Sequence, residues 1–509
     1  MASSTVSSRT PSSRTRRNQG GGTARPLLRA GAAAALLSCL LPAIALGLTR
    51  ELRVATEQAR RVAPALGVHV VDVASGETVY GFEPDRNRII ASNTKLLTSA
   101  AAVDLLTPGH FIETSLRANG LVAGGELQGD LAVVGAGDPS ISGRHFGDDA
   151  LFIFRSWGEQ LRAAGVERVS GDLVLVDGLF DAEQVHPDWP RNQLHKWYEA
   201  PVSALSFNDN TVWVWVRPGA GSGAPAQAEI TPYVPTVKIS NRAKTTRHRS
   251  KHSIQINRKP GSDVIEVSGW VYSGAEPFVS AVTVPDPELL FGHALIAGLA
   301  QSGVTLAGSL RIRNDLPEAP WRVVARHRTS VATVIEVVNK RSQNFYAESL
   351  LKLLGALDCG LGSWASGREV VARFLERVGI PRGTYIYSDG SGMSRNNQFS
   401  PRQLTTLLRH MYFHRDGKAY MQSLAYSGES DFDPPWMKSS LSERLEESSY
   451  RHNVLAKTGG LNGVSTLSGY VKARSGKLYA FSILCNSAPA RWRAVDAQDR
   501  IVRTLIDRG

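Results

Sequence analysis

The sequence predicts a mixed α/β (α+β) domain whose two halves are separated by a long β-rich insertion. The first half, from Leu66 to Leu106, combines alternating strands with an alanine-rich helix. Short apolar strands bounded by Gly and Pro clusters then fill residues 111–313. Helical periodicity returns at Val331 and is followed by two strands and an amphipathic helix that ends near Ile506. Strands and helices at both ends of a β-rich middle indicate one domain interrupted by inserted material.

The first half begins with a predicted β-hairpin. Leu66–Val73 and Glu77–Phe82 alternate apolar and polar residues around the turn Ala74-Ser75-Gly76. The segment from Ser92 to Leu106 is apolar on all sides, which is typical of a buried helix, and Pro108-Gly109 stops it.

The insertion and the second half each have a readable pattern. Strands are predicted in the insertion at Leu131–Val134, Asp172–Val176 and Thr211–Val216. The second half is predicted to contain helices at Val331–Asn339, Phe345–Leu354, Ser366–Val378 and Ala494–Ile506, and strands near Leu467–Val471 and Leu478–Leu484. No internal repeat is found in the sequence.

Residues 1–45 have the composition of a signal peptide. They are rich in Ser, Arg and Gly up to Arg25, and an apolar run from Ala30 to Leu41 leads to a cleavage site at Ala43-x-Ala45. We therefore expect export to the periplasm or the cell-wall space. Retention as an anchor is the alternative, although a spanning helix needs about 18 apolar residues and Pro42 interrupts this run.

Charge and cysteine content restrict the function classes. The predicted signal peptide contains six arginines and no acid, so its removal lowers the formal net charge from +12 to +6. A mildly basic chain of this kind does not have the charge signature of a nucleic-acid-binding protein. Cys39 lies in the signal peptide, and a disulfide between Cys359 and Cys485 is allowed in an oxidising compartment but is not determined by the sequence.

Ser92 and Lys95 place a hydroxyl and an amine three residues apart at the start of the buried helix. Side chains with this spacing lie on one helix face. The helix N-terminus favours developing negative charge, and burial favours the neutral amine that can take a proton from the serine. The pattern alone has low specificity, because Ser349 and Lys352 repeat it inside a helical segment that has no start signal.

Ser342 and Asn344 lie in a polar break between two predicted helices, where a short loop can direct a hydroxyl and an amide into one cleft. Ser206 and Ser394 also begin Ser-x-Asn patterns. The interhelical setting therefore selects Ser342.

Lys457, Thr458 and Gly459 follow the apolar segment Val454–Ala456, which indicates a strand whose edge lines a site. The lysine supplies a point charge for a carboxylate and the threonine a hydroxyl donor. Gly459 and Gly460 leave room for a substrate backbone.

The order Ser-x-x-Lys, Ser-x-Asn, Lys-Thr-Gly resembles the signature of the penicillin-binding and serine β-lactamase superfamily. Within it, the chain is most similar to the DacB-type D-alanyl-D-alanine carboxypeptidase/endopeptidases, the low-molecular-mass class C penicillin-binding proteins, which carry a large insertion between the first two motifs. Ser92 and Ser342 are 250 residues apart. Further matches lie at Gly137–Ser140, Ala200–Asn210, Asn344–Glu348 and Asp389–Arg395.

The resemblance implies a penicillin-binding catalytic domain with helices around an antiparallel sheet, formed by residues 46–112 and 318–509. It is expected to be interrupted by two smaller, mostly β domains. The first, domain II, would comprise residues 113–180 and 283–317, and the nested domain III residues 181–282.

The resemblance also implies a serine-type D-Ala-D-Ala carboxypeptidase, with D,D-endopeptidase activity on peptidoglycan crosslinks. Its substrates would be peptidoglycan stem peptides, and β-lactams would acylate and inhibit it. Ser92 would attack the carbonyl between the two terminal D-alanines, with Lys95 as general base. Ser342 would relay the proton to the leaving amine, and Asn344 would hold Lys95 and the substrate amide. No metal or cofactor is expected, and the oligomeric state stays open.

The remaining predicted site residues bind the substrate. Lys457 and Thr458 would hold the terminal carboxylate, and Gly459 would leave space for the peptide. The backbone amides of Ser92 and Gly460 are candidates for the oxyanion hole.

Two other functions fit the sequence less well. A β-lactamase would need a water-activating group, and the class-typical Glu motif does not follow Ser92. A wall-binding scaffold without activity would not need Ser92, Lys95, Ser342 and Lys457 together.

Two further patterns are weaker. Asn241–Pro260 contains seven Lys or Arg and no acid, so it could bind phosphate-rich wall polymers or a membrane surface, but a solvated hairpin is favoured. His248/His252 and His410/His414 have a spacing that suits a metal, but no third ligand accompanies either pair.

Overall fold

The computed structural model of the 509-residue chain describes residues 47–430, 432 and 435–509. The predicted signal peptide lies outside these residues and stays a prediction. Within the described ranges, the search for a helix with the length and apolar character of a membrane span finds none.

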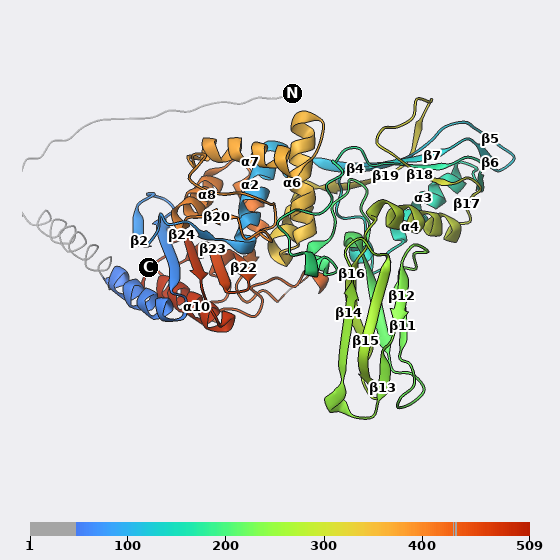
Figure 1. The fold of residues 1–509 in the computed structure, drawn as a ribbon. Helices are drawn as coiled ribbons and strands as arrows, with labels where there is room; N and C mark the ends of the chain where they lie inside the picture. Colours follow the sequence, from blue (N-terminus) through green and yellow to red (C-terminus); the bar gives the residue numbers. More distant parts are fainter. Residues whose placement is uncertain (1–46, 431, 433–434) are drawn as a thin grey trace, which may run out of the picture. The chain divides into compact units, whose positions relative to one another are not determined.

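A six-stranded antiparallel sheet carries the last of the three motifs (Figure 1). Its strand order is β2-β1-β24-β23-β22-β21. The bounds are β1 (Ala65–Asp72), β2 (Thr78–Phe82), β21 (Ala425–Tyr426), β22 (Val454–Leu461), β23 (Val464–Lys472) and β24 (Leu478–Asn486). Because β1 pairs with β24, the two ends of the described chain build one sheet, and the predicted hairpin and C-terminal strands are confirmed.

Helices cover both faces of this sheet. Residues 47–62 are helical and pack with α10 (Arg491–Arg508) on one face, in a cluster that includes Val68 and Val70 of β1. On the opposite face, α8 (Pro401–Phe413) packs against β1, β23 and β24, and α2 (Thr94–Leu106), α5 (Val331–Glu336), α6 (Asn344–Cys359) and α7 (Trp364–Val378) belong to the hydrophobic cluster on that side. Successive side chains of a strand point to opposite faces, and His69 of β1 accordingly faces Thr405 of α8.

The predicted buried helix is confirmed as α2. Every residue from Thr94 to Val103 is buried, although only part of this stretch is apolar. A short 3₁₀ turn, η1 (Ala91–Asn93), precedes α2 and contains Ser92. The predicted helices of the second half are also confirmed, and α5 continues into the π-helical turn η7 (Val337–Arg341), which ends at Ser342.

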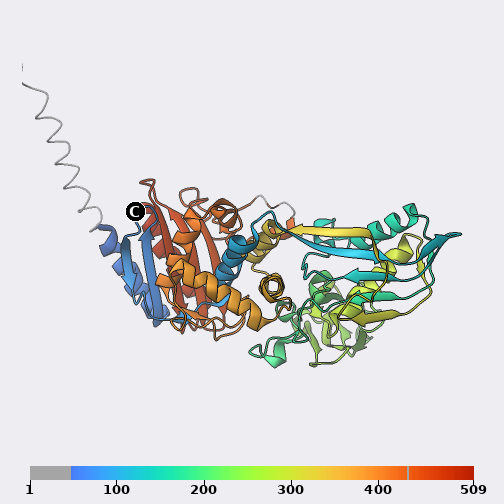
Figure 2. The same cartoon turned by 90° about the horizontal axis from the view of Figure 1, so that it is seen from above.

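The predicted insertion is rich in strands, as expected. Its largest sheet has the order β18-β9-β7-β4-β19. The strands are β4 (Phe111–Ala118), β7 (Leu131–Val134), β9 (Leu173–Val176), β18 (Leu310–Arg313) and β19 (Arg322–Ser330). Figure 2 shows β4 in cyan beside β19 in yellow, so the two ends of the insertion lie together in one antiparallel pair.

Smaller sheets complete the insertion. They contain β5 (Leu121–Ala123), β6 (Glu126–Gln128), β8 (Arg168–Val169), β10 (Thr211–Arg217), β11 (Gln227–Thr231), β12 (Lys238–Asn241), β13 (Lys244–Thr246), β14 (Ser253–Arg258), β15 (Val264–Tyr272), β16 (Phe278–Thr283) and β17 (Thr305–Leu306). Two helices, α3 (Phe152–Ala163) and α4 (Pro287–Gln301), were not predicted from the sequence. The buried residues of α3 (Ile153, Phe154, Trp157 and Leu161) recur with helical spacing, so the sequence contained a signal for this helix that the prediction missed.

The hydrophobic clusters follow the insertion only in part. One cluster joins buried residues from Leu116 to Ala325, and it includes members of both predicted domains II and III. Residues 180–204, which fall mostly in predicted domain III, contribute Trp189 and Val202 to the cluster around α2. The domain boundaries therefore stay a prediction.

Candidate active site

Ser92 and Lys95 are brought together by the turn that leads into α2. The Nζ atom of Lys95 lies 3.1 Å from the Oγ atom of Ser92. Thr466 of β23 donates a hydrogen bond of 2.9 Å to the carbonyl oxygen of Ile90 and so attaches this turn to the sheet. The Lys95 side chain is completely buried.

Ser342 and Asn344 lie between η7 and α6, as the polar break predicted. Ser342 has left-handed backbone angles (φ 60°, ψ 35°), which end the π-helical turn and let α6 start at Asn344. Lys95 donates a hydrogen bond of 2.7 Å to Oδ1 of Asn344. The Nδ2 atom of Asn344 donates in turn to the carbonyl oxygen of Tyr198 (2.8 Å), so the amide orientation is defined on both sides.

Lys457 lies in β22 with its ammonium group turned into the protein. Its Nζ atom donates to Oγ of Ser342 (2.8 Å) and to the carbonyl oxygen of Thr458 (2.8 Å), and the side chain is fully buried. Burial, and secondarily the charge of Lys95, holds the pKa of Lys457 well below its usual value. The third motif is thus hydrogen-bonded directly to the second.

Gly459 permits the close approach of β22 to the nucleophile turn. A β-carbon at this position would lie 3.0 Å from the backbone nitrogen of Ser92 and 2.1 Å from Oγ1 of Thr466. Any other residue would push β22 away from Ser92. The requirement for glycine is therefore steric.

Two opposing effects set the protonation of Lys95, namely its burial and the charges of nearby acids. Desolvation lowers the pKa of Lys95 to about 7, while the charges of Glu348 and Asp389 act in the opposite direction. Desolvation also raises the pKa of Glu348 to about 7. A lysine with this pKa carries a large neutral fraction at physiological pH, which is what a proton acceptor requires.

The turn after Asp389 supplies a contact that the sequence pattern did not predict. The carbonyl oxygen of Ser391 accepts a 2.6 Å hydrogen bond from Nζ of Lys95. Glu348 accepts hydrogen bonds from the backbone amides of Gly390 (2.8 Å) and Ser391 (2.7 Å), and Asp389 accepts one from Gly392 (2.7 Å). These carboxylates thus hold the turn that holds Lys95.

Gly392 lets this turn lie against the nucleophile segment. Its φ is +84°, and a β-carbon there would lie 1.9 Å from the carbonyl oxygen of Ala91. The family similarity at Asp389–Arg395 drew attention to this turn. The role of the Ser391 carbonyl could not be predicted, because every residue has a backbone carbonyl whatever its side chain.

The insertion also contributes to the site. The carbonyl of Tyr198 accepts from Asn344, as described above. Gln343, between the two residues of the second motif, donates a 2.6 Å hydrogen bond to Asp209, which also forms an ion pair with Arg144. Asp209 belongs to three consecutive left-handed residues, 208–210, and such strained backbone is typical of functional regions.

A cavity of about 840 Å³ opens over these residues. The predicted site residues that line it are Ser92, Ser342, Asn344, Thr458, Gly459 and Gly460. Lys95 and Lys457 do not line the cavity and are buried behind it. The cavity wall also contains Met393, and Trp197 and Tyr198 show that the insertion contributes directly to the wall.

The second Ser-x-x-Lys pair has a different environment. Ser349 is buried in α6, and its hydroxyl has no hydrogen-bond partner among the described residues. Lys352 forms an ion pair of 2.6 Å with Asp181, and its Nζ atom lies 4.1 Å from the ring centroid of Trp364. This lysine is a structural cation.

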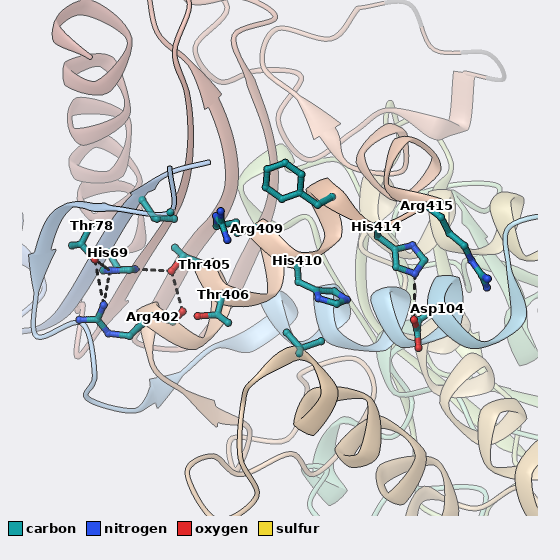
Figure 3. A pocket seen from close by; sticks show the side chains of 14 residues that line it. His69, Thr78, Asp104, Arg402, Thr405, Thr406, Arg409, His410, His414 and Arg415 are labelled. Carbon is teal, nitrogen blue, oxygen red and sulfur yellow. Dashed lines mark hydrogen bonds and ion pairs between the residues drawn. The ribbon is translucent and has the colours of Figure 1, made fainter. Parts of the chain in front are cut away.

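Another cavity, of about 810 Å³, lies along α8 and is shown in Figure 3. It contains His410 and His414, whose ring centroids are 6.1 Å apart, and His414 is hydrogen-bonded to Asp104 (3.2 Å). In the part of the chain that the structure describes, no three His, Cys, Asp or Glu side chains form a metal-binding group. His248/His252 are not brought to either cavity.

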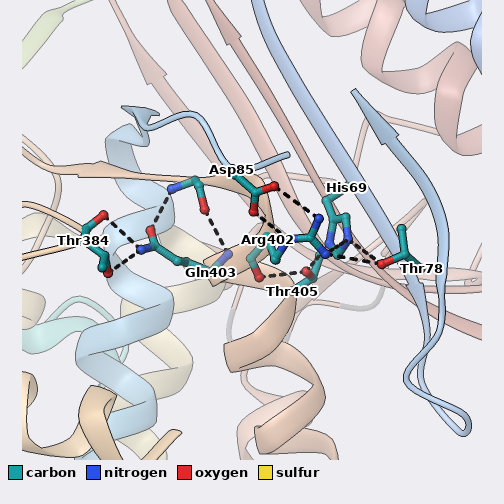
Figure 4. Close-up of polar contacts among 8 residues, drawn as sticks. His69, Thr78, Asp85, Thr384, Arg402, Gln403 and Thr405 are labelled. Carbon is teal, nitrogen blue, oxygen red and sulfur yellow. Dashed lines mark hydrogen bonds and ion pairs between the residues drawn. The ribbon is translucent and has the colours of Figure 1, made fainter. Parts of the chain in front are cut away.

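Figure 4 shows the polar network at one end of this second cavity. Arg402 donates to Nε2 of His69 (3.1 Å), so the other ring nitrogen carries the proton and donates to Thr405 (2.6 Å). Asp85 balances the charge of Arg402 through two further bonds. Burial, followed by the charge of Arg402, lowers the pKa of His69 to about 4.

The structure also describes the two cysteines and the basic segment. Cys359 is exposed, Cys485 is buried, and both are free thiols. In the basic segment 241–260, Arg258 is buried and donates to the carbonyl oxygens of Leu194 and Thr283, so this arginine is structural rather than solvated.

Comparison with known proteins identifies the family of this chain. The profile of the D-Ala-D-Ala carboxypeptidase 3 (S13) family matches residues 48–505. A D-alanyl-D-alanine carboxypeptidase of Actinomadura sp. is 34% identical over 445 residues, which cover 85% of this chain and 80% of that protein. The D-alanyl-D-alanine carboxypeptidase DacB of Haemophilus influenzae is 24% identical over 404 residues, covering 77% and 79%.

The solved structures show the same fold. The crystal structure of penicillin binding protein 4 (dacB) from Haemophilus influenzae matches with a TM-score of 0.77 at 21% identity, and covers 89% of this chain and 99% of that one. The predicted α/β fold class is therefore confirmed. On the family match and the relative at 34% identity, the chain belongs to the D-Ala-D-Ala carboxypeptidase 3 (S13) family and is a serine-type D-Ala-D-Ala carboxypeptidase.

Proposed function

We propose that this carboxypeptidase acts through an acyl-enzyme on Ser92, with Lys95 as its general base. The observation that carries the proposal is the set of three contacts around Nζ of Lys95. Two of them, to Oδ1 of Asn344 and to the carbonyl oxygen of Ser391, are to atoms that only accept. A neutral amine has two hydrogens, which these acceptors take, so its lone pair is left for the hydroxyl of Ser92 at 3.1 Å.

The reaction follows from this arrangement. Ser92 loses its proton to Lys95 as Oγ attacks the carbonyl between the two terminal D-alanines. The C–N bond breaks, the leaving amine takes a proton relayed by Ser342, and free D-alanine departs. Water then hydrolyses the ester, and Ser92 recovers its proton. The backbone amides of Ser92 and Gly460 would stabilise the oxyanion in both steps.

The third motif supports the leaving-group side of the site. Thr458 lines the cavity and can donate its hydroxyl to the terminal carboxylate. Lys457 donates a hydrogen bond to the hydroxyl of Ser342 and would orient this hydroxyl for the proton relay. Gly459 keeps β22 close to the turn that carries Ser92.

The proposed substrates are peptidoglycan stem peptides that end in D-Ala-D-Ala, and D-alanyl crosslinks of the same wall. β-Lactams would acylate Ser92 as substrate analogues. A structure of the Haemophilus influenzae protein, which matches with a TM-score of 0.72 at 20% identity, is a complex with a β-lactam. Such substrates lie outside the cytoplasm, which agrees with the predicted signal peptide and with export to the periplasm or the cell-wall space.

Labelling with fluorescent penicillin tests the nucleophile. The wild-type protein should label stably and the Ser92→Ala variant should not. Ser349→Ala is the matched control, because it removes the serine of the other Ser-x-x-Lys pair and only an unpartnered buried hydroxyl. Equal labelling of wild type and Ser92→Ala would overturn the assignment.

Purified muropeptides test the substrate range. Release of D-alanine from pentapeptide monomers measures carboxypeptidase activity, and conversion of crosslinked dimers to monomers measures endopeptidase activity. We expect both products from the wild type and neither from Ser92→Ala. Intact dimers after complete trimming of the pentapeptides would exclude the endopeptidase activity.

A further inference from the structure

The side of the catalytic cavity that faces the leaving group needs a positive charge that Lys457 does not present. A carboxypeptidase of this class must bind the free carboxylate of the last residue. The ammonium group of Lys457 is fully buried, bonded to Ser342 and to the Thr458 carbonyl, and absent from the cavity wall.

Arg491 places a guanidinium group on that wall. It is the first residue of α10 and lines the same cavity as Thr458 and Gly460. A β-carbon at Gly460 would lie 2.8 Å from both Cζ and Nη2 of Arg491. The absence of a side chain at position 460 therefore leaves the space that the guanidinium occupies, directly after the Lys-Thr-Gly motif.

Arg491 differs from the other two arginines of the cavity in its bonding. Arg395 donates to the carbonyl oxygen of Asn462 (3.0 Å), and Arg341 donates to that of Lys438 (3.2 Å). Among the residues that the structure describes, Arg491 has neither a hydrogen bond nor an ion pair. Its donors are thus available to a ligand in the cavity.

The position of Arg491 is not explained by helix stability. A cation at a helix N-terminus opposes the macrodipole, and the first turn of α10 contains no acidic residue to balance it. No side chain caps this end of the helix. A bound carboxylate would satisfy both the guanidinium and the positive end of the helix.

We infer that Arg491 binds the C-terminal carboxylate of the peptide, together with Thr458, and thereby determines the specificity for substrates with a free terminus. The inference rests on the proposed function of the site. A guanidinium forms two parallel hydrogen bonds with a carboxylate, and it remains charged at any pH at which the enzyme works. Arg491 acts on binding and orientation and takes no part in the proton transfers.

Two substrates separate this role from the chemistry. The first is an acyl-D-Ala-D-Ala peptide, and the second is the p-nitrophenyl ester of the same acyl-D-alanine, whose leaving group has no carboxylate. In Arg491→Ala, the ratio of kcat/KM for the peptide to that for the ester should fall about 10- to 100-fold, the value of a charged hydrogen-bonded contact. Arg491→Lys should restore part of the ratio.

The matched control is Arg493→Ala. Arg493 carries the same charge in the same turn of α10 but lies outside the catalytic cavity. In Arg493→Ala, the ratio of kcat/KM for the peptide to that for the ester should therefore match the wild type. A ratio within about threefold of wild type in Arg491→Ala, which is under 1 kcal/mol, would overturn the inference. So would an equal loss on both substrates, or a fall in ratio seen in Arg395→Ala or Arg341→Ala but not in Arg491→Ala.

Failure of the underlying function would look different. If Ser92→Ala still turned over the activated ester at the wild-type rate, the acyl-enzyme assignment would be wrong whatever Arg491 does. Loss of ester turnover in Ser92→Ala, together with a changed substrate ratio in Arg491→Ala, supports both.

Discussion

The Nζ atom of Lys95 and the carbonyl oxygen of Ser391 are 2.6 Å apart, although 296 residues separate them in the chain. The turn that presents this carbonyl is held by Glu348 and Asp389, the two acids whose charges oppose the desolvation of Lys95. The two acids that hold this turn therefore also limit how far burial lowers the pKa of Lys95.

The activity should depend on the deprotonation of Lys95. Since the neutral amine is the proposed base and its pKa is about 7, kcat/KM should rise with pH through that region. The charge of Glu348 raises the pKa of Lys95, so Glu348→Gln should move this acid limb to lower pH. The pH dependence of kcat/KM for hydrolysis of a D-Ala-D-Ala peptide, measured between pH 5 and 9 in the wild type and in Glu348→Gln, checks this. A limb that moves upward, or does not move, would contradict the assignment.

The variant Asn344→Asp should have the opposite effect. It places a carboxylate where Oδ1 lies 2.7 Å from Lys95 and removes the donor to Tyr198. The added charge keeps the lysine protonated, so kcat/KM at pH 7 should fall about 100-fold or more, and the acid limb should move to higher pH. Asn344→Ala, which adds no charge, is the comparison. An acid limb at the same pH in both variants would argue against direct electrostatic control.

Substitution of the lysine in each of the two Ser-x-x-Lys pairs should affect different properties, stability for Lys352 and activity for Lys95. Lys352→Met leaves Asp181 without its ion-pair partner and should lower the free energy of unfolding by about 2–4 kcal/mol. Lys95→Met should abolish penicillin labelling without lowering stability, because it removes a buried amine that desolvation disfavours. Denaturant unfolding and labelling of both variants check this. A large stability loss in Lys95→Met would show that its contacts are structural.

His69 should make the fold sensitive to mild acid. Its folded pKa is about 4, below the unfolded value of about 6.5, so the unfolded chain binds more protons between these pH values. Its contribution is complete above about pH 6.5 and declines as the pH falls toward 4, by about 1–3 kcal/mol. In His69→Gln this part of the pH dependence should vanish. Denaturant unfolding of both proteins at pH 7 and pH 4.5 measures this difference. The same loss of stability between the two pH values in His69→Gln and in the wild type would refute the prediction.

Much of the fold could be read from local patterns. The alternation in β1 and β2 and the apolar stretch after Ser92 have strong periods, and the structure contains the corresponding elements. The helix α3 was not predicted, although its buried residues recur with helical spacing. The pairing of β1 with β24 was beyond any local pattern, since their partners are more than 400 residues apart in the chain.

The three motifs, their order and the position of Ser92 at the head of a buried helix could all be read from the amino-acid sequence. These follow from side-chain identity and from short-range periodicity. Three features became visible only in the folded chain. Lys457 turns away from the cavity toward Ser342, and the carbonyls of Ser391 and Tyr198 hold the catalytic groups. Arg491 lines the cavity beside Gly460. Backbone carbonyls have no signature in sequence, and the direction of a buried side chain depends on packing between segments that are distant in the chain.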